Sequence, residues 1–112
     1  MVGRSTDMLQ GTLDVLILKS LSWGPRHGYA VAKWLEGTTE DELAIEEGSL
    51  YPALYRMERK GWIEASWGTS ELGRRAKFYS LTPAGRSRLR AQVQEWRRFS
   101  AAVGKVLDSA RA

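Results

Sequence analysis

The chain lacks cysteine entirely and has a single histidine, His27, among its 112 residues. Without cysteine it can form no disulfide framework and offers no thiolate for nucleophilic chemistry, which fits a reducing compartment. It also lacks a signal-peptide pattern and any apolar run near the roughly 20 residues that span a bilayer. We therefore expect a cytoplasmic protein that is not attached to a membrane.

Motifs of catalytic and metal sites are missing as well. The sequence contains no Gly-rich phosphate loop of the GxxxxGK[ST] type, and His, Asp and Glu do not cluster at metal-ligand spacing. The acidic segment 40–47 lacks both the spacing and the central glycine of an EF-hand loop. The sequence therefore predicts no catalytic residues, no metal site and no cofactor, and so no enzyme.

Charge is distributed unevenly along the chain. Residues 1–61 carry 7 Lys and Arg against 9 Asp and Glu, a net of −2, whereas residues 62–112 carry 10 against 4, a net of +6. With 43% hydrophobic and 27% charged residues, the chain is expected to fold as one globular domain. The second half is therefore the half expected to face a polyanion or a partner.

The segment 48–60 is predicted to form the helix around which the rest is organised. Leu50, Leu54 and Met57 repeat at helical spacing and are expected to be buried. The opposite face carries small, hydroxyl and guanidinium groups: Gly48, Ser49, Pro52, Tyr55, Arg56 and Arg59. Because proline suits the first turn of a helix, the start is expected near Glu47. Such a helix suits the DNA major groove, and the simpler alternative is an ordinary amphipathic surface helix.

Two helices are expected before it, over about 9–21 and, shorter, over about 28–35. The first is apolar on more than one side, because Val15 and Leu18 lie off its main stripe. A partner chain is therefore a candidate to cover its second side. His27, at the start of the second helix, is expected to be structural rather than pH-sensing.

After residue 61 the apolar pattern changes from helical spacing to alternation. Residues 63–67 and 78–81 are predicted to be short strands, joined by a long hairpin tip over 68–77. Three cations lie on the return arm of this tip: Arg74, Arg75 and Lys77. Three short helices followed by a hairpin indicate a winged helix-turn-helix.

A last helix is predicted from Thr82-Pro83 toward Ser109, because a hydroxyl cap followed by proline is a strong helix start. At about 1.5 Å per residue it is roughly 40 Å long, too long for so small a domain to cover. Its apolar residues form a near-heptad seam: Leu89, Val93, Trp96, Phe99, Val103, Val106 and Leu107. The seam predicts a homodimer.

The run GSLYPALYRMERKGWI over 48–63 resembles the recognition-helix signature of the PadR-like transcriptional regulators. LQGTLDVLIL at 9–18, HGY at 27–29 and GRRAKFYSLT at 73–82 support the resemblance. It covers about residues 8–107, and the single C-terminal helix is similar to that of the small subgroup of the family. The implied fold is mainly α with a small β-hairpin: a winged helix-turn-helix plus one long C-terminal dimerisation helix.

The predicted elements also give expected domain bounds. The winged-helix DNA-binding domain is expected over 8–82 and the dimerisation helix over 83–110. Residues 1–7 are expected to be a loose lead-in, and residues 111–112 a tail.

The function implied by the resemblance is that of a homodimeric regulator, usually a repressor, bound to a palindromic operator in double-stranded DNA. The recognition helix would enter the major groove, and the wing would reach the adjacent minor groove. The expected DNA contacts are Tyr29, Ser49, Tyr51, Pro52, Tyr55, Arg56, Arg74, Arg75 and Lys77. Arg56 can pair with guanine or hold a phosphate, and Pro52 can meet a thymine methyl group. Packing is the alternative role for Tyr29 and Tyr51.

Small members of the family often hold flat aromatic effectors at the dimer interface, which releases the operator. The candidate pocket residues are Val15, Leu18, Val93 and Trp96. The alternative for Trp96 is an ordinary interface role, since aromatic residues are enriched at interfaces.

Two other uses of the fold remain open from the sequence. A winged helix can serve protein–protein contact without sequence-specific DNA binding, and RNA binding is a further option. The cations of the hairpin favour DNA, whereas the acidic segment 40–47 counts against it. Salt separates these functions, because a DNA-binding protein loses affinity steeply as salt is added.

Overall fold

The computed structural model describes residues 2–110, with residues 2–10 described by their backbone alone. The elements in chain order are α1 (Val2–Ser20), β1 (Arg26–His27), α2 (Gly28–Thr38), α3 (Glu47–Arg59), β2 (Ile63–Thr69), β3 (Arg75–Leu81) and α4 (Pro83–Leu107). This order confirms the predicted winged helix with one long last helix. No helix in the described part of the chain is both long and apolar enough to cross a membrane.

The hydrophobic core lies where α1, α2 and α3 meet against the sheet. Leu50, Leu54 and Met57 are at most 1% exposed, which confirms the predicted inner face of α3. Burial of an aliphatic side chain of this size contributes about 1.5–3 kcal/mol, so this face is sufficient to fix the rotation of α3. The outer face of the helix is thereby fixed as well.

The first helix differs from the prediction at its start and on its second side. It begins at Val2 rather than near Leu9, so the expected lead-in is helical over residues 2–7; residue 1, like the expected tail 111–112, lies outside the described residues. Leu18 is fully buried in the core of the chain itself, and Val15 is half-buried. The expectation that Leu18 faces a partner is wrong, because α1 contacts α2, α3 and α4 of its own chain.

The hairpin of β2 and β3, residues 63–81, is called the wing below. Its antiparallel register runs from Ile63 opposite Leu81 to Thr69 opposite Arg75. The predicted tip of 68–77 was therefore too long, because pairing continues until a tight turn over 70–74. Gly73 has φ of 75° in this turn, and the Ser70 N–H donates to the Arg74 carbonyl at 2.8 Å. Arg75 is thus on a strand, not in the tip.

A third strand, β1, was missed by the prediction. It pairs antiparallel with β3, placing Arg26 opposite Tyr79 and His27 opposite Phe78, so the sheet order is β1-β3-β2. Two residues are too few to show an alternating pattern in a sequence. The strand joins the start of α2 to the wing.

The start of α4 is fastened to the base of the wing. The Thr82 hydroxyl accepts from the Gly85 N–H at 3.0 Å, and the Thr82 N–H donates to the Trp62 carbonyl at 3.1 Å. A Cβ on Gly85 would lie 1.9 Å from that carbonyl oxygen, so only glycine fits there. The predicted start is confirmed, whereas the helix ends at Leu107 rather than near Ser109.

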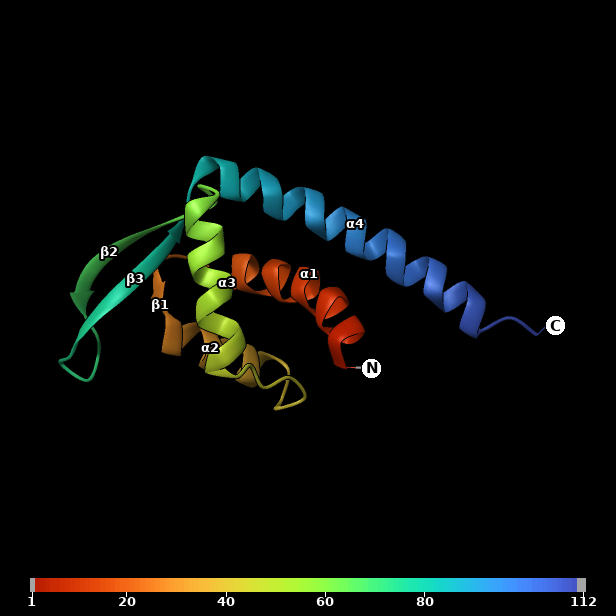
Figure 1. Ribbon diagram of the computed structural model, residues 1–112, viewed down its shortest axis with the longest axis horizontal. Coiled ribbons are helices and arrows are strands. Elements are labelled where there is room, and N and C mark those ends of the chain that lie inside the picture. Colours follow the sequence, from red (N-terminus) through yellow and green to blue (C-terminus); the bar gives the residue numbers. More distant parts are fainter. Residues whose placement is uncertain (1, 111–112) are drawn as a thin grey trace.

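Beyond this start, α4 runs alongside α1 and then extends past the rest of the chain (Figure 1). Five large apolar side chains of the predicted seam are exposed: Trp96, Phe99, Val103, Val106 and Leu107. Leu89 was expected in the interface but packs against the core of its own chain, because it lies where α4 still covers the domain. Val93 is half-buried. The outer half of α4 therefore carries an apolar face that the described chain does not cover.

Candidate nucleic-acid interface

The outward face of α3 has the predicted composition. The helix begins at Glu47, where the position of Pro52 placed it, and its exposed residues include Gly48, Ser49, Pro52, Tyr55 and Arg59. The Arg59 guanidinium lies over the Tyr55 ring at 5.7 Å. The small residues Gly48 and Ser49 lie exposed near the start of the helix. The ring and hydroxyl of Tyr55 stand further along the same face.

Arg56 departs from this pattern. Its guanidinium is half-buried and donates a hydrogen bond to the Asp14 carboxylate of α1, with which it forms an ion pair. Burial raises the pKa of Asp14, and the charge and hydrogen bond of Arg56 oppose that rise. The pair fastens α3 to α1. The sequence held no local signal for it, since the two residues are 42 positions apart.

We expect Arg56→Met to destabilise the protein by about 1–3 kcal/mol at pH 7, because it leaves the buried Asp14 carboxylate without its ionic partner. Folding raises the pKa of Asp14 above 3.8, so its contribution to stability is present below pH 3.8 and lost as pH rises through the folded pKa. Without Arg56 that pKa rises further.

The free energy of unfolding, measured by urea titration, should therefore show a larger loss at pH 7 than at pH 4 for Arg56→Met. Arg59→Met is the matched control, since Arg59 is exposed on the same helix, and should change stability little. A loss of equal size at both pH values would show that packing of the Arg56 stem, not the ion pair, is responsible.

The wing and the starts of α2 and α3 line a concavity with a volume of about 430 Å³. We call it the wing concavity. Five of the predicted DNA contacts line it together: Tyr29, Tyr51, Arg74, Arg75 and Lys77. The other four, Ser49, Pro52, Tyr55 and Arg56, are not among its lining residues. The fold thus gathers two of the predicted tyrosines and three cations, together with Tyr79 and the Glu71 carboxylate, into one concavity beside the outward face of α3.

The wing cations are held in different ways. Arg75 stacks over the ring of Trp67 at 4.6 Å, and Lys77 forms an ion pair of 3.3 Å with Glu58 of α3. Arg74 lies exposed in the turn. Trp67 was predicted only as an alternating strand residue, yet it is 61% exposed and supports Arg75. The structure therefore adds an aromatic ring to the cationic surface.

His27 connects α2 to the wing. Its Nδ1 accepts from the Ala30 N–H at 3.1 Å and so caps α2, while its Nε2 lies 3.1 Å from a Glu71 carboxylate oxygen. The tautomer with its proton on Nε2 satisfies both contacts. This confirms the structural role predicted for His27 and gives it a second one that the sequence did not show. The histidine holds the wing turn beside the start of α2.

Gly28 sets the position of the Tyr51 ring. A Cβ at position 28 would lie 2.7 Å from Tyr51 Cε1 and 2.9 Å from its hydroxyl oxygen. We expect Gly28→Ala to push the half-exposed ring aside, changing stability by no more than about 1 kcal/mol. Affinity for DNA should fall about tenfold, because the Tyr51 hydroxyl, predicted to donate to a phosphate, would be displaced.

Fluorescence anisotropy with labelled duplex measures this loss. Gly37→Ala is the matched control, because Gly37 is in the same helix and nothing lies within 4 Å of its added Cβ. Unchanged affinity in Gly28→Ala would assign Tyr51 to packing alone.

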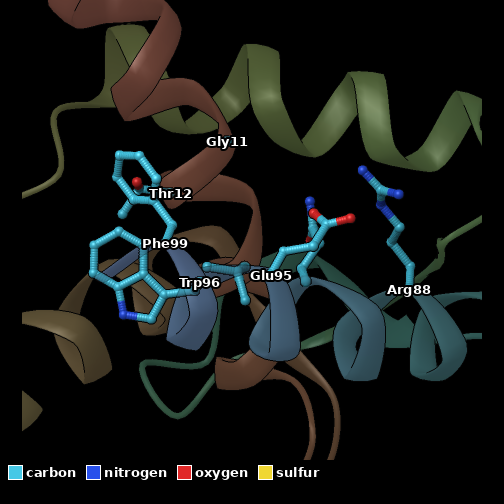
Figure 2. A pocket seen from close by; sticks show the side chains of 8 residues that line it. Gly11, Thr12, Arg88, Glu95, Trp96 and Phe99 are labelled. Atoms are coloured by element: carbon cyan, nitrogen blue, oxygen red, sulfur yellow. The ribbon is translucent and has the colours of Figure 1, made fainter. Parts of the chain in front are cut away.

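A second hollow, of about 350 Å³, lies between α1 and α4, and we call it the α1–α4 groove. Its lining residues are Gly11, Thr12, Val15, Arg88, Gln92, Glu95, Trp96 and Phe99. Figure 2 shows the Trp96 and Phe99 rings together at one end, with Arg88 at the other. Of the predicted pocket residues, Val15 and Trp96 line the groove, whereas the buried Leu18 and the half-buried Val93 are not among its lining residues.

The side chains that the structure describes contain no group of three or more His, Asp or Glu placed to hold a metal ion.

Known proteins similar to this chain include a family and a full-length relative. The model of the transcriptional regulator PadR-like family matches residues 17–91 of the chain. An uncharacterized protein of Lysinibacillus sphaericus is 32% identical over 103 residues, which cover 92% of this chain and 91% of that protein.

Solved structures are similar over nearly the whole chain. A transcriptional regulator from Clostridium thermocellum is 30% identical with a TM-score of 0.80, covering 88% of this chain and 96% of that one. A PadR-like transcriptional regulator from Bacillus cereus is 32% identical with a TM-score of 0.77, covering 92% and 98%.

Proposed function

This chain belongs to the PadR-like family of DNA-binding transcriptional regulators, and from that premise we propose that it represses transcription as a homodimer bound to a palindromic operator. The observation that carries the proposal is the wing concavity, which places Tyr29, Tyr51 and the wing cations beside the outward face of α3. A protein that contacts bases in a groove and the phosphates beside it needs both sets of side chains on one surface. We propose that the protein acts in the cytoplasm, where it is bound to DNA.

We divide the DNA contacts between base reading and positioning. Ser49, Pro52 and Tyr55 are exposed on α3 and are the candidates for base edges in the major groove. Tyr29, Tyr51 and the three wing cations are the candidates for phosphates and the adjacent minor groove. Arg56 can reach a base only by giving up Asp14, so we assign it to positioning α3 rather than to base reading.

The exposed seam of α4 supports the homodimer. Trp96, Phe99 and Val103 are each at least 38% exposed, and Val106 and Leu107 more than 70%. A second copy of α4 would bury these side chains, and two-fold symmetry would match the two halves of a palindrome. On this proposal, residues 8–82 bind DNA and residues 83–110 join the two subunits.

We further propose that a flat aromatic effector releases the operator by binding in the α1–α4 groove. The rings of Trp96 and Phe99 are half-exposed, with centroids 6.2 Å apart and planes tilted by 44°. The half-buried Val15 lines the same groove. In a dimer built on α4 the groove would adjoin the interface. An effector there would act on the relative placement of the two DNA-binding domains.

The first test is fluorescence anisotropy with labelled duplex from upstream of the protein's own gene. The proposal predicts binding that survives excess random duplex and weakens about 10³–10⁵-fold from 50 to 200 mM salt, if about 6–10 phosphates are contacted. Binding that random duplex abolishes at every salt concentration would contradict a specific operator in this region. The protein–protein alternative would then be tested next.

A further inference from the structure

The wing turn carries an exposed leucine that has no part in the DNA contacts proposed above. Leu72 is 71% exposed, and no other large apolar side chain of the described residues outside α4 is more exposed. Gly, Pro, Asn, Asp and Ser dominate tight turns, so turn chemistry does not account for a leucine there. Leu72 lines the wing concavity together with Trp67, which is 61% exposed. The wing therefore presents apolar surface as well as cations.

The turn that carries Leu72 is held in one conformation. After the leucine, the Gly73 N–H donates to the Ser70 carbonyl at 2.9 Å and closes the turn. Before it, the Glu71 carboxylate lies 3.1 Å from His27 Nε2, and this contact ties the turn to the start of α2. Because the backbone is fixed on both sides of Leu72, little conformational entropy is lost when the leucine binds a partner.

The turn forms one end of the molecule, with cations beside it. In Figure 1 it lies at the end opposite to the C-terminal end of α4, so its leucine can enter a groove narrower than the domain. Arg74 is exposed in the same turn, and Arg75 follows at the start of β3. A leucine followed by two cations fits a partner that is anionic at its edges and apolar within.

The minor groove of DNA has this chemistry. It is about 6 Å wide, with phosphates along both edges and base edges on its floor. Proteins that bind there frequently insert an apolar side chain, leucine included, between two base pairs and kink the duplex. Pyrimidine–purine steps are the easiest to unstack. Since α3 presents its outward face to the adjacent major groove in the proposed function, DNA is favoured over an acidic protein as the partner of Leu72.

We propose that Leu72 enters the minor groove as an apolar wedge, so that affinity for the operator depends on a pyrimidine–purine step where the wing meets the DNA. The step opens to admit the side chain, while Arg74 and Arg75 hold phosphates beside it. This inference rests on the proposed function. It adds a residue that reads how easily the DNA deforms rather than which bases it presents.

The first comparison is Leu72→Ala against the wild-type protein, by anisotropy with the operator across a salt series. We expect affinity to fall about tenfold or more, because each wing loses an apolar group that the groove would bury. The slope of log affinity against log salt should stay unchanged, since no charge is removed. Leu43→Ala is the matched control and should bind like the wild-type protein, because Leu43 is exposed in a loop that does not line the wing concavity.

The second comparison changes the floor of the minor groove and leaves the major-groove groups that distinguish adenine from guanine in place. Each adenine of the operator is replaced in turn with 2-aminoadenine, which adds an amino group to the floor, and each guanine with inosine, which removes one. At the step under the wing, the added group should weaken wild-type binding about fivefold, and its removal should strengthen binding. Leu72→Ala should change less than about twofold at the same step.

Wild-type affinity in Leu72→Ala would overturn the wedge and leave the leucine for a protein partner. A shallower salt slope in Leu72→Ala would overturn it too, because the substitution would then act through the wing cations. Equal sensitivity of both proteins to the modified bases would assign the minor groove to the arginines, and the proposed function would stand without the wedge. If the wild-type protein prefers no duplex over random DNA, the proposed function is overturned together with the wedge, and this result appears before any variant is compared.

Discussion

Replacing Val103 and Leu107 together with aspartate should convert the protein to a monomer and lower its affinity for the operator by about 10³-fold or more. The two side chains are 38% and 76% exposed and lie on the half of α4 that extends beyond the domain. In the proposed dimer they are buried against their copies, so two carboxylates per subunit would be placed in an apolar interface. A monomer then holds one half-site, and its affinity falls toward that for random DNA.

Sedimentation velocity measures the oligomeric state, and anisotropy measures the affinity. The matched control is the double variant Gln94→Asp, Ala101→Asp, which adds the same charge at exposed positions about half a turn away on α4. The control should remain dimeric and bind the operator nearly as well as the wild-type protein. An intact dimer at micromolar concentration in the Val103, Leu107 variant would assign the interface to another surface.

The second large effect concerns the wing. Replacing Arg74 and Arg75 with alanine should make the negative slope of log affinity against log salt shallower by about 3 to 4. The reason is that the two wings of a dimer would together lose four phosphate contacts. Both residues are exposed and line the wing concavity. Because the lost contacts are ionic, the deficit relative to the wild-type protein should be largest at low salt. It should shrink about 100-fold between 50 and 200 mM.

Anisotropy with the same duplex across a salt series gives both quantities. The control is Arg97→Ala, Arg98→Ala, which removes the same charge from exposed positions on α4 and should leave the slope nearly unchanged. If the two double variants lower the slope equally, overall charge rather than the wing governs binding. If neither does, the wing does not contact phosphates.

The repeating patterns of the chain could be predicted because each depends on a short segment alone. Leu50, Leu54 and Met57 specify the inner face of α3 through helical spacing, and Thr82-Pro83 specifies the start of α4 through its cap. The winged-helix fold follows from the order of these segments, whereas the family was inferred from the resemblance of the run 48–63 to the recognition-helix signature. The unpaired tip of the hairpin was predicted to be too long. Pairing of Gly68 with Ala76 depends on the partner strand and not on local alternation.

The placement of charged and polar groups was decided only by the tertiary structure. Arg56 looks like a DNA contact from its place on α3, yet Asp14, 42 residues earlier, draws it inward. Likewise His27 meets Glu71 only because β1 and the wing join one sheet. Helical and strand periodicity arise from backbone geometry and are readable along the chain. Ion pairs, caps across elements and the α1–α4 groove arise from segments distant in sequence, and no local pattern encodes which of them meet.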